Sequence, residues 1–395
     1  MDKQVTTGSQ RLELLDSVRG FALMGLFLVH SVEGYETFWA HPDFGAVYQW
    51  DFGLFSGKAY ALMALCFGVS FYLIMQGAAR RGHDYRWRFA WRLTLLFGIG
   101  LIHSVFYRGD ILQILALLGF VMLPLDRIKS NRVVLVLALL CFLELPLLLR
   151  AWLASKGVTW AAATPYFFND AGMAALLHGS FTDVARANLT AGAVLNWSYS
   201  IESGRAVQML GLFMVGLVLG RAGFFTDPDR FKPQRRILLA LSIVLAAPLY
   251  FYGSDALNSL MPDGPVRQNL GMAFDKWTGL AIATAELLLF IDLYQGAGRK
   301  LLGLFANPGR MTLTLYVGQS VAFAPVFYGY GLGLNAILTP GECLLMGVVA
   351  AAVQGFLAHW WMRRFHYGPL EWLWRAATRT SLDIPFVKIA APAMA

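Results

Sequence analysis

The chain alternates between long apolar stretches and short polar segments. About ten of these stretches are long enough, alone or with their flanks, to form a helix that crosses a bilayer. They cover residues 14–34, 56–79, 87–107, 110–126, 132–153, 205–223, 236–253, 272–294, 309–332 and 340–363. The pattern predicts an all-α, polytopic integral membrane protein with about ten transmembrane helices. Within the fifth stretch, Glu144 and Pro146 predict a kink and a polar contact.

The connections between the stretches divide the chain into parts. Residues 1–153 are predicted to form an N-terminal transmembrane half with spans one to five, and residues 205–380 a C-terminal half with spans six to ten. Residues 381–395 form a tail. Residues 154–204 are too long for a simple turn and are rich in aromatic side chains. We expect this external segment either to lie in the membrane interface as short helices or to be a lid over an outer site.

Composition and charge support this class of protein. Of the 395 residues, 57% are hydrophobic and only 14% are charged, whereas soluble domains have about 25% charged residues. The net charge of +8 does not point to nucleic acid, because Lys and Arg cluster in alternate loops, after the second, fourth, sixth and eighth spans and in the tail. The positive-inside rule then puts both termini in the cytoplasm, and membrane lipids surround the protein.

The third and fourth apolar stretches meet at a short polar turn. A turn this short makes the two helices antiparallel neighbours, and it brings His103, Arg108 and Asp110 to one membrane face. An ionisable group within an apolar run must find a partner or line a cavity. Two plainer interpretations stay open. Asp110 and Gln113 have the spacing of a capping box, and a backbone carbonyl would satisfy a buried His103.

The first span carries polar residues at helical spacing. Arg19, His30 and Glu33 share one face, with Arg19 near the cytoplasmic end and His30 roughly 16 Å away, near the outer end. A carboxylate beside an imidazole sets its tautomer and raises its basicity, as a general base needs. Alternatively, this pair only orients the end of the helix. His41, in the outer loop, is a second candidate base.

Further polar residues occur at the starts and on the faces of other spans. Lys58 precedes the second span at the outer side, and Arg310 begins the ninth span at the cytoplasmic side. Tyr316 and Gln319 belong to a polar face of the ninth span, which either packs against other helices or lines a substrate path. Glu286 lies deep in the eighth span, where it needs a partner on another helix.

Several segments resemble a known family. They are the Leu-Asp-x-x-Arg-Gly-x-Ala motif within 11–22, the segments 57–62 and 66–68, the pair 100–103 and 109–112, and the C-terminal segments 309–314 and 368–375. Together these resemble the bacterial YeiB-like membrane proteins, which have a C-terminal domain of unknown function. The resemblance implies a multi-pass protein of the bacterial cytoplasmic (inner) membrane.

A more distant resemblance concerns activity. The YeiB-like proteins are similar to transmembrane acyltransferases such as the heparan-alpha-glucosaminide N-acetyltransferases, whose first span carries an Arg-Gly pair and a nearby functional His. Arg19-Gly20 and His30 correspond to this layout. The resemblance implies an acyl-CoA donor from the cytoplasm, acetyl-CoA foremost, and a small-molecule or glycan acceptor outside. No metal is expected. The His-x-x-Trp-Asn-Gly-like loop is lacking, and the segment around His41 is only a loose counterpart, so the choice of catalytic His stays open.

If the protein is an acyltransferase, the charged residues have natural roles. Arg19 and Arg310 would hold the phosphates of the donor. Lys58 or Arg108 would steady the developing oxyanion.

The base would be His30 or His103, oriented by Glu33 or Asp110. His30 is favoured, because its carboxylate lies on the same helix, whereas the acidic neighbour of His103 lies across a turn. The second hypothesis is a proton-coupled transporter or exporter of a small solute, with intramembrane His, Glu and Asp residues along its path. A homodimer is compatible with either.

Overall fold

The computed structural model describes residues 3–388, with side chains from residue 13 onward. Every predicted span corresponds to a helix. They are α1 (Lys3–Val32), α3 (Ala59–Ala79), α4 (Arg86–Ser104), α5 (Leu112–Leu125), α6 (Asn131–Phe142) with α7 (Leu145–Ser155), α12 (Arg205–Ala222), α13 (Lys232–Leu260), α14 (Pro265–Gln295), α17 (Thr312–Phe327) and α18 (Pro340–Arg364). Within the described residues the only β pairing is an isolated bridge between Phe365 and Val387, so the all-α prediction is confirmed.

Seven segments of the described chain are long and apolar enough to cross a membrane. They contain α1, α3, α6 with α7, α12, α13, α14 and α18. Helices α5 and α17 are apolar but shorter. Helix α4 begins with Arg86 and Arg88, and Arg92 follows one turn later. The protein therefore has the helices of a polytopic membrane protein, and a count of ten spans stays a prediction.

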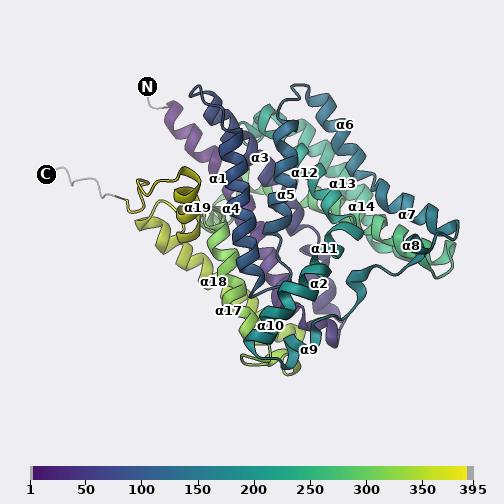
Figure 1. Cartoon of the computed structure of the whole chain (residues 1–395). Coiled ribbons are helices and arrows are strands. Elements are labelled where there is room, and N and C mark those ends of the chain that lie inside the picture. Colours follow the sequence, from purple (N-terminus) through teal and green to yellow (C-terminus); the bar gives the residue numbers. More distant parts are fainter. Residues whose placement is uncertain (1–2, 389–395) are drawn as a thin grey trace.

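Helix α1 runs through the middle of the bundle (Figure 1). It contacts α3, α17, α18 and the short helix α16 (Ala306–Arg310). Leu23 and Phe27, on its apolar surface, are fully buried. Figure 1 shows the start of α1 and the C-terminal helix α19 (Pro369–Arg379) at one end of the bundle, and α9 and α10 at the other.

Helices α3 and α12 approach very closely. A Cβ atom at Gly68 would lie 2.1 Å from the carbonyl oxygen of Phe213, and one at Gly216 would lie 2.2 Å from that of Leu65. No side chain fits at either position, and small residues allow this approach between apolar helices.

Two of the predicted spans are interrupted. Glu144, between α6 and α7, has a left-handed backbone (φ 52°), and Pro146 follows at the start of α7, so the predicted kink is confirmed. The predicted polar contact is wrong for the described residues, because neither carboxylate oxygen of Glu144 has a hydrogen-bond partner within residues 13–388. The predicted span 309–332 is instead divided at Met311 into α16 and α17. The break is stable because the Glu371 carboxylate accepts hydrogen bonds from the amides that open α17, as described below.

The connection between the seventh and eighth spans is shorter than expected. Helices α13 and α14 extend to Leu260 and from Pro265, so only 261–264 connect them. At 29 and 31 residues they measure about 43 and 46 Å, longer than a bilayer core of about 30 Å. The two helices pack against each other, which stabilises helical structure beyond the apolar stretch.

The segment 154–204 folds into short helical elements. They are α8 (Thr159–Ala162), η2 (Tyr166–Phe168), α9 (Met173–His178), α10 (Phe181–Ala187), η3 (Asn188–Gly192) and α11 (Ala193–Glu202). Other short elements are η1 (Thr37–Ala40), α2 (Ala46–Leu54), η4 (Pro228–Phe231), α15 (Arg299–Leu302), η5 (Gly303–Phe305) and η6 (Leu334–Ala336). The amide of Gly329 donates to the carbonyl of Leu176 at 2.8 Å, which fastens α9 to the end of α17.

Candidate functional site

His103 and Asp110 form the most buried charged contact at the predicted turn. His103 lies in the last turn of α4 and Asp110 just before α5. Nδ1 of the imidazole is 2.8 Å from Oδ1 of the carboxylate, and both side chains have 0% exposure. The other carboxylate oxygen accepts from the amide of Gln113 at 3.0 Å. Asp110 therefore both caps α5 and contacts the imidazole, so the two sequence interpretations hold together.

The capping box itself is not completed. The amide group of Gln113 donates to Ser104 Oγ at 2.7 Å rather than back to Asp110. It thereby fastens α5 to the last turn of α4, beside the His103–Asp110 pair.

The second ring nitrogen of His103 is free. Its Nε2 is buried and has no hydrogen-bond partner within residues 13–388. When Nδ1 carries the proton and donates it to the carboxylate, Nε2 holds the lone pair. Asp110, rather than a backbone carbonyl, is thus the partner of His103. The pair has the arrangement of a carboxylate-oriented general base.

Tyr107 connects this pair to the end of α1. Its ring centroid lies 6.1 Å from that of His103 and 5.1 Å from that of His30. The Tyr107 hydroxyl is 3.1 Å from Nδ1 of His30. Tyr316 also packs against His103, with the ring centroids 4.9 Å apart. The polar face of α17 predicted from the sequence therefore reaches the candidate site through Tyr316.

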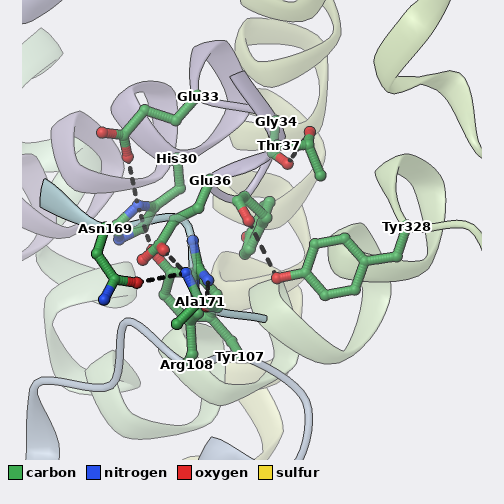
Figure 2. Close-up of polar contacts among 11 residues, drawn as sticks. His30, Glu33, Gly34, Glu36, Thr37, Tyr107, Arg108, Asn169, Ala171 and Tyr328 are labelled. Carbon is green, nitrogen blue, oxygen red and sulfur yellow. Dashed lines mark hydrogen bonds and ion pairs between the residues drawn. The ribbon is translucent and has the colours of Figure 1, made fainter. Parts of the chain in front are cut away.

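His30 has a looser acidic contact than His103. Oε2 of Glu33 lies 3.4 Å from Nδ1 of His30, the same nitrogen that the Tyr107 hydroxyl approaches (Figure 2). The sequence predicted the His30–Glu33 pair, and the pair is present. The spacing is nevertheless longer than the 2.8 Å between His103 and Asp110, and the two side chains are 13% and 14% exposed.

Arg108 fastens the 154–204 segment to the same turn. Its Nε donates to the carboxylate of Glu36, and its Nη1 donates to the carbonyl of Ala171 at 3.1 Å (Figure 2). Burial lowers the pKa of the guanidinium, but the charge and hydrogen bond of Glu36 raise it more, so the pKa lies above its ordinary value. Arg108 is thus a fixed cation beneath this segment.

The sequence did not predict a role for Glu36. Its backbone explains how it reaches Arg108, because Gly34, Tyr35 and Glu36 have successive φ angles of 52°, 52° and 79°. Left-handed conformations are costly for residues with a side chain, and they occur preferentially at functional sites. The Tyr328 hydroxyl supports the turn by donating to the Tyr35 carbonyl at 3.0 Å (Figure 2). The only sequence signal was a second Glu three positions after Glu33.

Three predicted site residues have no described polar contact with His103 or Asp110. His41 is exposed at the end of η1. The Lys58 ammonium donates to the carbonyl of Phe52 at 3.0 Å, and the charges that act on it are those of Glu286 and Asp275. The Gln319 amide is paired with Gln354 on α18 at 2.8 Å.

The charges of the two predicted donor-binding arginines both act on Asp16, nearer the start of α1. Arg19 contacts the carboxylate of Asp16 at 2.8 Å and Ser70 Oγ at 2.6 Å. The charge of Arg310 acts on the same Asp16 carboxylate. Gly309 makes this possible, because a Cβ atom there would lie 1.7 Å from the carbonyl oxygen of Asp16.

Glu371 joins two of the C-terminal motifs. Its Oε1 accepts from the amides of Leu313 and Thr314 at 2.6 and 3.0 Å, which are orphan donors at the start of α17. Burial raises the pKa of this carboxyl, although the hydrogen bonds from Thr314 and Leu313 oppose the shift. The contact holds α17, and with it Tyr316, in place.

Apolar helices with buried ionisable groups at their ends define a polytopic membrane protein. Residues 219–381 match a family model described as a protein of unknown function, DUF418. The chain is 27% identical to the uncharacterized protein YxaH of Bacillus subtilis over 96% of both chains. It is 28% identical to the uncharacterized protein YeiB of Escherichia coli over 93% of this chain and 96% of the relative. These matches confirm the resemblance to the YeiB-like proteins.

Proposed function

We propose that this protein is a membrane acyltransferase. It moves an acyl group from a cytoplasmic acyl-CoA, acetyl-CoA foremost, to a hydroxyl or amine acceptor at the outer face of the bacterial cytoplasmic membrane. The observation that supports this most strongly is the buried His103–Asp110 pair, in which the imidazole keeps a nitrogen without a partner among the described residues. A carboxylate-oriented imidazole is the group that activates a hydroxyl or amine for acyl transfer.

The chemistry follows from this geometry. Nε2 of His103 accepts the proton of the acceptor while the acceptor oxygen or nitrogen attacks the thioester carbonyl carbon. The Asp110 carboxylate, at 2.8 Å from Nδ1, stabilises the imidazolium that forms. When the tetrahedral intermediate collapses, the carbon–sulfur bond breaks and the proton passes to the leaving thiolate. The products are the acylated acceptor and free CoA.

Neighbouring residues assist this base. The sequence favoured His30, but its contact with Glu33 is 3.4 Å long and its Nδ1 is shared with Tyr107. The hydrogen-bond geometry favours His103, and His30 then supports it or binds the acceptor through the Tyr107 hydroxyl. Arg108 is a buried cation on the same turn as Asp110, and we assign it the stabilisation of the oxyanion.

We place the donor site at the end of α1 opposite to His30. With ten spans and both termini cytoplasmic, as the loop charges favour, Arg19 and Arg310 face the cytoplasm beside Asp16. They would hold the CoA phosphates. The rise of α1 separates Arg19 from His30 by roughly 16 Å, a distance that an extended pantetheine arm can bridge.

Binding of radiolabelled acetyl-CoA to the purified protein tests the donor site. Wild type should bind it, and Arg310→Gln should weaken binding at least about tenfold through the loss of a charge-assisted contact. Arg132→Gln is the matched control, because Arg132 is an exposed arginine at the start of α6. Absence of binding to wild type, or equal binding by all three proteins, would contradict the donor site.

Proton-coupled transport is the second candidate. Two carboxylates in the transmembrane region favour it. Both oxygens of Glu144 and one oxygen of Glu286 are buried and have no hydrogen-bond partner within residues 13–388. Such groups often carry protons in transporters. Substrate-dependent proton uptake into proteoliposomes that Glu286→Gln abolishes, without binding of acetyl-CoA, would favour this alternative.

A further inference from the structure

Two cations in the helical bundle form no ion pair with a carboxylate among residues 13–388. Arg205 is the first residue of α12, and Lys276 lies in α14. Both are partly buried, and neither forms an ion pair within 4.0 Å in the part of the chain that the structure describes. A cation among apolar helices is costly unless something compensates its charge.

The contacts of these cations are neutral aromatic rings. The guanidinium carbon of Arg205 lies 4.2 Å from the ring centroid of Tyr60 and 5.3 Å from that of Tyr199. The ammonium of Lys276 lies 5.9 Å from the Tyr199 centroid. Such contacts orient a cation without cancelling its charge. Tyr199, the ring that both cations approach, is 37% exposed.

The surrounding helices are cross-linked at this point. The Gln208 side chain accepts from the Tyr60 hydroxyl at 2.5 Å and donates to the carbonyl of Lys276 at 2.8 Å. One amide therefore joins α3, α12 and α14 beside the two cations. The cations are consequently held by a fixed framework rather than by mobile surface loops.

The start of α12 adds positive potential. Gly204 precedes the helix with φ 79°, and no side chain caps the first turn. The amides and the dipole at the start of this 18-residue helix favour an anion there. The Glu144 carboxylate lies beside this start, since a Cβ atom at Gly204 would be 2.3 Å from its Oε2, but it forms no hydrogen bond within residues 13–388. Arg205 contributes a further unused donor, because its Nε is buried without a partner within residues 13–388.

We propose that Arg205 and Lys276 bind an oxyanion, a phosphate or carboxylate group. The acidic groups whose charges interact with these cations are Glu33 with Arg205, and Glu144 and Asp275 with Lys276. None of them forms an ion pair with either cation within residues 13–388. Glu33 also contacts His30, so the site is adjacent to the histidines of the candidate functional site. On the basis of the proposed function, we assign this oxyanion to the acyl acceptor.

Thermal unfolding of the purified full chain in an uncharged detergent tests the site. Inorganic phosphate should raise the Tm of wild type above that in chloride at equal ionic strength, because a ligand that binds the folded state stabilises it. Arg205→Gln and Lys276→Gln should lose this rise, and Arg205→Lys should keep part of it. Arg267→Gln should keep all of it, because Arg267, which lies on the same helix as Lys276, is paired with Asp263.

Two results would overturn the proposal. One is no phosphate-dependent rise in wild type, and the other is an equal rise in wild type and both Gln variants. If Arg205→Gln does not fold, Lys276→Gln still decides, since the Lys276 ammonium forms a cation–π contact but no hydrogen bond or ion pair within residues 13–388. The assay contains no acyl donor, so its outcome is independent of whether transfer occurs.

Lipid discs separate a lipid headgroup from a soluble ligand. For a soluble oxyanion, the phosphate-dependent rise should persist in discs of phosphatidylcholine and of phosphatidylglycerol. For a headgroup, phosphatidylglycerol itself should raise the Tm of wild type but not of the Gln variants, and added phosphate should then have no effect. Either result supports an oxyanion site and identifies its source.

Discussion

The carboxylate of Asp110 contacts Nδ1 of His103 at 2.8 Å while its second oxygen caps the following helix. One side chain therefore sets both the start of α5 and the tautomer of the imidazole at the end of α4. Because the turn between the helices is short, folding of this hairpin alone brings the two residues together. The candidate base is thus oriented by local structure, and the rest of the bundle supplies its burial.

Asp110→Asn separates the two roles of this residue. Asparagine caps helices about as well as aspartate, so we expect the variant to fold with a Tm close to that of wild type. Without the negative charge, the imidazolium loses its stabilisation, and transfer should fall by about 10²–10⁴-fold. Transfer assays and thermal unfolding of the same preparation measure both effects. Retained transfer would exclude Asp110 from the site.

The Arg108–Glu36 pair should couple strongly. The side chains are only 7% and 21% exposed, so removal of one partner leaves a poorly solvated charge. We expect Glu36→Gln to destabilise the protein by roughly 2–4 kcal/mol. Arg108→Gln combined with Glu36→Gln should cost less than the sum of the two single changes, and a double-mutant cycle in thermal unfolding measures the difference. Additive effects would mean that the pair contributes no coupling.

Gly309 should tolerate no side chain. A Cβ atom there would lie 1.7 Å from the carbonyl of Asp16, whereas one at Gly318 in α17 meets no atom within 4 Å. Gly309→Ala should therefore separate α16 from α1, with a cost of roughly 3 kcal/mol or more and a loss of acetyl-CoA binding. Gly318→Ala, the control, should be neutral or stabilising by up to about 1 kcal/mol. Similar behaviour of the two variants would refute the close contact.

Membrane topology is testable with reporters. A reporter fused after Arg81, in the basic connection between α3 and α4, should be cytoplasmic. One fused near Asp170, in the 154–204 segment, should be external. Opposite locations are expected because an odd number of spans separates the two sites in the ten-span arrangement. The same location for both would refute that arrangement.

The sequence predicted the helices well, because apolar periodicity and length are local properties. It predicted the hairpin around Asp110 for the same reason. It could not predict Tyr107 between His30 and His103, since that contact depends on how α1 packs against the α4–α5 turn. It also missed Glu36, whose position depends on a left-handed backbone that the residue types do not favour.

The separation of Lys58 from the histidines has a similar cause. At the sequence level, Lys58 and Arg108 were equivalent, as both are basic residues at the outer ends of spans. In the fold, Arg108 lies under the 154–204 segment beside Glu36, while Lys58 turns toward Phe52 and the charges of α14. Only tertiary packing distinguishes the two.

The most direct test of the central claim is acyl transfer by purified His103→Gln. Glutamine can still donate a hydrogen bond to the buried Asp110 carboxylate, so the variant should fold, but its amide cannot accept the proton of the acceptor. Labelled acetyl-CoA binding and acceptor acylation are measured on the same preparation, with His30→Gln alongside. We predict wild-type donor binding by His103→Gln, with transfer reduced by about 10²–10⁴-fold and a smaller loss in His30→Gln. Normal transfer by His103→Gln would contradict the assignment of His103 as the base.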